Sequence, residues 1–175
     1  MASRSLFASS SRAAGSYLRN SAPRRGFLKE GLKYTKTHEW VNVDQNLATF
    51  GVTDYAFAHF RFLDYFWIPE VGTSATQGKK IKRADTFFYM KSGMRYKNIL
   101  APVSGKIVQV NDDVKESHRT SSDGTDYKFF YPYEDGWMVK IEMSDPSEVD
   151  ELMDSDQYSK FIEDKDAAKA TLYNL

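Results

Sequence analysis

Residues 101–110 read Ala-Pro-Val-Ser-Gly-Lys-Ile-Val-Gln-Val, a chain break followed by a strand. Pro102 and Gly105 interrupt regular structure, because proline lacks a backbone N–H and glycine lacks a Cβ. The next five residues come close to alternating between polar and apolar side chains, which is typical of a strand with one buried face. Residues 111–113, Asn-Asp-Asp, then supply a turn. This stretch predicts a β-rich fold of short strands joined by tight turns.

Segments on both sides of this stretch extend the pattern. Residues 33–52 alternate around a turn at 44–46, which predicts a hairpin. Further strands are expected at 62–68, 81–90 and 137–143. The sum is a compact β sandwich or barrel.

Helices are expected at three places. Thr53 can cap a short helix near 53–60. Asp145, with Pro146 next and Glu148 three residues on, resembles a capping box that starts a helix. Ser155 can cap another, so the predicted fold is mainly β with C-terminal helices.

Composition limits the chemistry that the chain can perform. Its 175 residues are 41% apolar and include no cysteine, so one folded domain is expected without disulfides, thiol nucleophiles or cysteine-bound metals. The formal net charge is zero, but the basic and acidic residues are unevenly distributed along the chain. Beyond residue 29 the chain is acidic, so no basic surface that would bind nucleic acid is expected. No apolar run is long enough to predict a membrane-spanning helix.

The first segment has the composition of a targeting sequence. Residues 1–27 are rich in Ser and Arg, contain no Asp or Glu, and would form an amphipathic helix, which is typical of a mitochondrial transit peptide. We therefore predict a targeting segment at 1–27, a folded domain at 28–175, and a location in the mitochondrial matrix or on the matrix side of an inner-membrane complex. The alternative is a basic arm that is retained and binds an acidic partner.

Catalytic motifs are scarce. The chain has three histidines, and none has a second ligand at metal-binding spacing, so no metal site is predicted. His38 and Glu39 could be a base and its orienting carboxylate. Adjacent residues of a strand face opposite sides, however, which favours a buried imidazole beside an exposed acid. We predict that the chain is not an enzyme.

A series of motifs from Lys33 to Asp164 is similar to the glycine cleavage system H protein family. The shared pieces are Tyr-Thr-Lys-Thr-His-Glu-Trp at 34–40, Gly-Val-Thr-Asp-Tyr-Ala at 51–56, Ile-Pro-Glu-Val-Gly at 68–72, Ala-Pro-Val-Ser-Gly at 101–105, Pro-Tyr-Glu-Asp-Gly-Trp at 132–137 and Ser-Asp-Pro-Ser-Glu at 144–148. The resemblance implies the lipoyl/biotinyl-type barrel-sandwich hybrid fold. It also implies a lipoyl group on a hairpin-tip lysine, which visits the enzymes of glycine decarboxylation in turn.

This chain departs from the family at that lysine. The family's position lies seven residues before the Ala of Ala-Pro-Val-Ser-Gly, and here Met94 stands there. A methionine cannot form the amide to lipoate. Lys91 or Lys97 could carry the group after a slip of register, which tends to move a side chain to the other face of a strand.

From this we predict a non-catalytic, structural or accessory subunit of a mitochondrial assembly, such as a respiratory complex or the mitoribosome, without a cofactor. The alternative is a lipoyl carrier of the glycine cleavage system that uses Lys91 or Lys97; a decoy that binds the same enzymes is a third hypothesis. Candidate partner contacts are Phe57, His59, Phe60, Arg61, Arg95 and Tyr96, because aromatic and Arg anchors dominate interfaces.

Overall fold

The structure is a computed structural model that describes residues 28–57, 65–83, 86–87, 89–92, 95–114 and 132–173. Its strands are β1 (Lys33–Tyr34), β2 (Glu39–Asp44), β3 (Leu47–Val52), β4 (Tyr65–Trp67), β5 (Ser74–Ala75), β6 (Lys82–Arg83), β7 (Thr86–Phe87), β8 (Tyr89–Ser92), β9 (Arg95–Asn98), β10 (Gly105–Val110) and β11 (Val139–Met143). Its helices are α1 (Asp54–Phe57), the 3-10 helix η2 (Pro146–Glu151) and α3 (Ser155–Tyr173). The predicted targeting segment, residues 1–27, lies outside the described residues.

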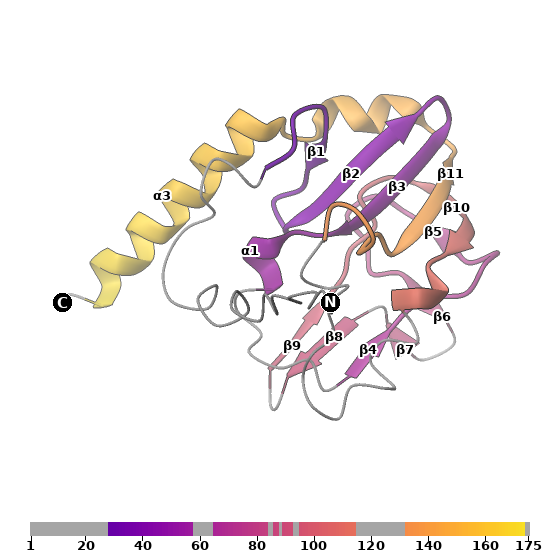
Figure 1. The fold of residues 1–175 in the computed structure, drawn as a ribbon, viewed down its shortest axis with the longest axis horizontal. Coiled ribbons are helices and arrows are strands. Elements are labelled where there is room, and N and C mark those ends of the chain that lie inside the picture. The colour runs from indigo at the N-terminus through magenta and orange to yellow at the C-terminus, as the bar shows by residue number, and fades with distance from the viewer. Residues whose placement is uncertain are drawn as a thin grey trace, which may run out of the picture.

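Antiparallel sheets form most of the described fold. The main sheet has six strands in the order β1-β2-β3-β11-β10-β5, a second has the order β4-β8-β9, and β6 pairs with β7. Figure 1 shows the two small sheets at one end of the molecule, while α3 runs along the opposite edge beside β1 and β2. The prediction of a mainly β fold with C-terminal helices is confirmed.

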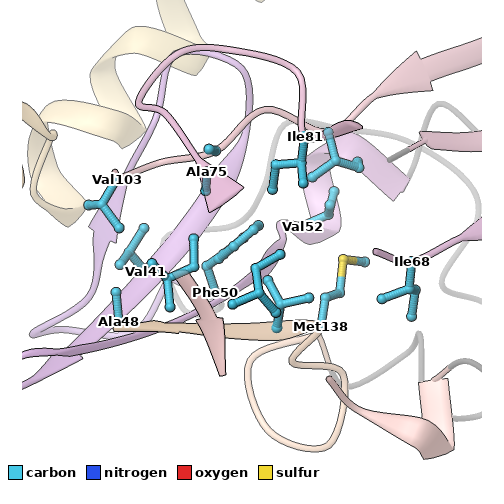
Figure 2. Close-up of a cluster of buried hydrophobic side chains, with 14 of the residues drawn as sticks. Val41, Ala48, Phe50, Val52, Ile68, Ala75, Ile81, Val103 and Met138 are labelled. Atoms are coloured by element: carbon cyan, nitrogen blue, oxygen red, sulfur yellow. The ribbon is translucent and has the colours of Figure 1, made fainter. Parts of the chain in front are cut away.

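The main core lies between the sheets. Phe50, Ile107 and Ile141 come from three neighbouring strands of the main sheet, and none of them is exposed to solvent. Ile68 and Ile81 approach from the segments that flank the small sheets, as Figure 2 shows. Full burial of each such side chain stabilises the fold by about 1.5 to 3 kcal/mol. This core fixes where the small sheets join the body.

A second, aromatic cluster lies under α3. The rings of Tyr34 and Tyr158 are stacked, with centroids 4.6 Å apart. Tyr55 and Trp40 belong to the same cluster, and Ile162 packs one helical turn after Tyr158. The cluster fastens α3 to the face formed by β1, β2 and α1.

Two local features differ from the sequence predictions. The alternation of β10 breaks at Val108, which is 40% exposed, because a bulge between Ile107 and Gln109 shifts the register with β11. An extra residue in one strand turns the next side chain to the other face. The capping box at Asp145 starts a 3-10 helix: the Asp145 carboxylate accepts from the backbone N–H of Ser147 at 3.0 Å.

The buried tyrosines predict a loss of stability at high pH. Burial raises the pKa of Tyr34 to about 12 and also raises the pKa of Tyr158 and Tyr133. Unfolded tyrosines ionise near pH 10, so above that pH the unfolded chain binds fewer protons and the free energy of unfolding falls. We expect a steep fall from about pH 10 to about pH 12, measured by urea unfolding and tyrosinate absorbance. Tyr158→Phe should make it less steep; an unchanged free energy across this range would contradict the burial of these phenols.

Candidate functional site

The hairpin of β8 and β9 occupies the position at which the resemblance places the functional group. Ser92 pairs with Arg95, so the two intervening residues, Gly93 and Met94, connect the strands. These two residues lie outside the described part of the chain. Lys91 pairs with Tyr96, one step further from the tip. The hairpin therefore places Lys91 close to its end.

One side and the base of the hairpin are tied to the rest of the fold. On one side β8 pairs with β4, with Lys91 opposite Tyr65. At the base, the backbone N–H of Ala101 donates to the carbonyl of Lys79 at 3.0 Å, and Lys80 forms a bridge with Leu100. The hairpin thus has a fixed base in the described structure.

Lys97 lies on β9, and its amine is engaged by the body of the protein. Its Nζ lies 3.7 Å from Oε1 of Glu39 and donates to the carbonyl of Thr37. The side chain of Lys97 is 19% exposed and that of Glu39 is 0% exposed. An ammonium held by a buried carboxylate and a carbonyl is a poor nucleophile, because it must leave the ion pair and lose a proton first. This contact counts against Lys97 as the residue that carries a lipoyl group.

Glu39 is the centre of a buried polar network. Its Oε2 accepts from the hydroxyls of Thr35 and Thr37, and its Oε1 accepts from the backbone N–H of Leu100 at 3.4 Å. The expectation that Glu39 is an exposed acid is wrong. His38 has φ of +74°, so the chain turns there and the strand rule of alternating faces does not apply. The network joins β2 to the base of the hairpin.

The Glu39 network predicts that Lys97→Ala is destabilising. Removing one partner of a buried ion pair leaves the other charge uncompensated, which costs about 3 to 5 kcal/mol. We expect a loss of about 3 kcal/mol in the free energy of unfolding, measured with urea. The double variant Lys97→Met with Glu39→Gln should recover most of it, and no loss in Lys97→Ala would show that Glu39 is not buried as a charged group.

His38 forms hydrogen bonds with two side chains of α3. Its Nε2 accepts from Nζ of Lys165 at 2.8 Å, so Nδ1 carries the proton and donates to the hydroxyl of Tyr158 at 2.9 Å. Oγ1 of Thr53 lies 3.0 Å from the same hydroxyl. Burial lowers the pKa of Lys165, and the charges of Lys169 and Lys97 lower it further. Both ring nitrogens are occupied, so the pair His38 and Glu39 has no arrangement for general-base catalysis.

The remaining predicted site residues are only partly covered. Phe57 ends α1 and packs, half-buried, against the main core. His59, Phe60 and Arg61 lie outside the described residues. Arg95 and Tyr96 begin β9, where the structure describes the backbone pairing alone. Their role as partner contacts stays a prediction. Among the described residues, no group of acids and histidines could hold a metal ion, and no helix is long and apolar enough to cross a membrane.

The antiparallel sheets, the added C-terminal helix and the hairpin of β8 and β9 at one end are the architecture of a lipoyl-type barrel-sandwich domain. A solved H protein of the glycine cleavage system from Mycobacterium marinum matches the fold with a TM-score of 0.60 at 23% identity, covering 76% of this chain and 97% of that one. The family model described as glycine cleavage H-protein matches residues 32–165. The chain belongs to the glycine cleavage H-protein family.

Curated relatives agree with this assignment. The chain is 43% identical over 155 residues to the mitochondrial glycine cleavage system H protein 2 of Arabidopsis thaliana, covering 87% of this chain and 91% of that protein. It is 38% identical over 138 residues to the mitochondrial H protein of Oryza sativa subsp. indica, covering 79% of this chain and 76% of that protein. Both relatives are mitochondrial proteins, which supports the predicted mitochondrial location.

The comparisons overturn two predictions. A structural or accessory subunit of a respiratory complex or mitoribosome is wrong, because the family model and the relatives are H proteins of the glycine cleavage system. The absence of a cofactor is wrong for the same reason, since lipoate is the group that this family carries. The alternative reading, a lipoyl carrier, fits the findings.

Proposed function

We propose that this protein is a lipoyl carrier of the glycine cleavage system and that Lys91 is its attachment residue. The observation that carries the choice of residue is the contact of Lys97 with Glu39 and Thr37, which engages the other candidate amine. Membership of the H-protein family supports the carrier function.

The position of Lys91 in the hairpin supports an attachment there. It stands one residue pair from the end pair of Ser92 and Arg95, so its backbone lies close to where the family holds its lysine. Met94 occupies the family's own position and has no amine. These observations favour Lys91 over the other two positions, because Met94 has no amine and the amine of Lys97 is engaged.

The protein's own residues hold and present the arm. When bound, lipoate supplies a dithiolane that accepts the aminomethyl fragment of glycine. Pairing of β8 with β4 and β9 fixes the direction of the hairpin, and the ion pair of Lys97 with Glu39 holds its base against β2. The chain itself makes and breaks no bond of the substrate. Residues 1–27 would direct this carrier domain, residues 28–175, to the matrix.

Mass spectrometry of the protein isolated from mitochondria tests the proposal. We expect an intact mass that contains one lipoyl amide, and peptide mapping should place it on Lys91. An adduct on Lys97 would show that the ion pair with Glu39 does not protect that amine. A protein without any adduct, in cells whose other lipoyl proteins are modified, would overturn the carrier function.

A further inference from the structure

Lys165 of α3 lies at one end of a series of hydrogen-bonded side chains that the proposed function does not use. Its Nζ donates to Nε2 of His38 at 2.8 Å, and Nδ1 of His38 donates to the hydroxyl of Tyr158 at 2.9 Å. The same hydroxyl lies 3.0 Å from Oγ1 of Thr53. A nucleophile within hydrogen-bond reach of a base, with the base oriented by a third group, is the arrangement of an activated nucleophile. This geometry indicates that the amine of Lys165 is reactive.

The imidazole of His38 is held in place by aromatic packing. His38 is buried, and its ring contacts the rings of Tyr55, Tyr158 and Phe161, whose centroids lie 4.7, 5.9 and 5.9 Å away. Because Nδ1 carries the proton, the lone pair of Nε2 faces Lys165 and can accept a proton from its nitrogen. A base that is already oriented needs no rearrangement before the proton moves.

The surroundings of Lys165 favour its neutral form, which is the nucleophilic one. Lys165 is half-buried, and this burial lowers its pKa. The charges of Lys169 and Lys97 lower the pKa further, whereas the charge of Asp166 opposes them. The Asp166 carboxylate also accepts from the hydroxyl of Tyr55 at 2.7 Å. At neutral pH, a larger fraction of Lys165 is therefore unprotonated than of an ordinary exposed lysine.

We infer that Lys165 is a site of covalent acylation by acyl thioesters, with His38 as the general base. The neutral Nζ attacks the thioester carbonyl, so that an N–C bond forms and the C–S bond breaks. Nε2 of His38 accepts the proton that the nitrogen loses and later releases it to water, and the departing thiolate takes up a proton from water. The products are an amide and a free thiol, and nothing is oxidised or reduced.

The chemistry of the site favours a thioester as the acyl donor. A thiolate is a good leaving group, because the pKa of a thiol is about 8.5, so an amine can displace it without a metal or a phosphate donor. The ring centroid of Phe161 lies 5.6 Å from Nζ of Lys165, which places an apolar surface beside the amine for an uncharged acyl chain. The inference goes beyond the proposed function and does not depend on which residue carries lipoate.

The test treats the full-length protein with S-acetyl-N-acetylcysteamine, a small acetyl thioester, at neutral pH and without another enzyme. Peptide mass spectrometry follows the acetylation of each lysine, and Lys160, which is exposed on the same helix, is the internal reference. His38→Gln keeps an acceptor for the amine and removes the base. Lys169→Gln removes a neighbouring charge at an exposed position, and Lys160→Gln is its matched control. Circular dichroism checks that each variant is folded.

We expect Lys165 to be acetylated about tenfold faster than Lys160, and His38→Gln to remove most of this difference. Lys169→Gln should slow acetylation of Lys165 about twofold, because loss of the neighbouring charge raises its pKa, whereas Lys160→Gln should leave the rate unchanged.

Equal rates at Lys165 and Lys160 in the unmodified sequence would overturn the inference. So would a rate at Lys165 that is unchanged in folded His38→Gln or in Lys169→Gln. The Lys169→Gln variant keeps the test decisive if His38→Gln does not fold, since position 169 is exposed. Failure of the proposed function is detected separately, by a protein from mitochondria that lacks the lipoyl adduct.

Discussion

Replacing Lys91 with arginine is expected to abolish lipoylation and, with it, glycine-dependent turnover by the reconstituted glycine cleavage enzymes. Arginine keeps the positive charge, but its guanidinium stays protonated and does not form the amide. The strand position of residue 91 is unchanged, since its backbone pairs with Tyr96 and Tyr65. The loss is measured by intact mass and by release of carbon dioxide from labelled glycine.

Two variants make this result specific. Lys97→Arg keeps a cation beside Glu39 and is expected to leave both the adduct and the turnover unchanged. Met94→Lys in the Lys91→Arg background restores an amine at the family's own position, and we expect it to regain the adduct. Full turnover by Lys91→Arg alone would show that another residue carries the group.

The strand pattern around residues 101–110 was sufficient to predict the fold class. A break at Pro102 and Gly105 followed by an apolar-polar strand is a local signal, and β10 begins at Gly105 as expected. The bulge at Val108 was not predictable in the same way, because it depends on the register with β11, about thirty residues further on. The residues of β10 alone predict the strand, whereas the pairing of β10 with β11 determines the bulge.

The site was predicted less completely than the fold. The resemblance identifies three positions for the lipoyl group: Lys91, Met94 and Lys97. The choice between the two lysines depends on the contact of Lys97 with Glu39, and a contact between residues so far apart in the sequence cannot be predicted from a short-range pattern. A weaker signal was present: Thr35, Thr37 and Glu39 are spaced two apart, so two hydroxyls can reach one carboxylate. The incorrect prediction of function has a different cause: it rests on the single substitution at Met94, whereas the whole series of motifs indicates the H-protein family.

Gly105→Ala is expected to be the most destabilising glycine-to-alanine substitution among the described residues. Gly105 pairs with Met143 in β11 and with Ala75 in β5, so neighbouring strands close around it. A Cβ at this position would lie 2.0 Å from the carbonyl oxygen of Glu142 and 2.7 Å from Cγ2 of Ile141. Its φ of +153° is also unfavourable for alanine.

The strands must separate to admit the methyl group, and this separation would open the main core beside Ile141. We expect a loss of about 4 kcal/mol in the free energy of unfolding, measured by urea denaturation. Gly72→Ala is the control: its φ is +90° and nothing lies within 4 Å of the added Cβ, so backbone strain alone should cost about 1 to 2 kcal/mol. Equal losses in the two variants would mean that the approach of β10 to β11 is looser than the structure shows, and that the strained backbone alone accounts for glycine at position 105.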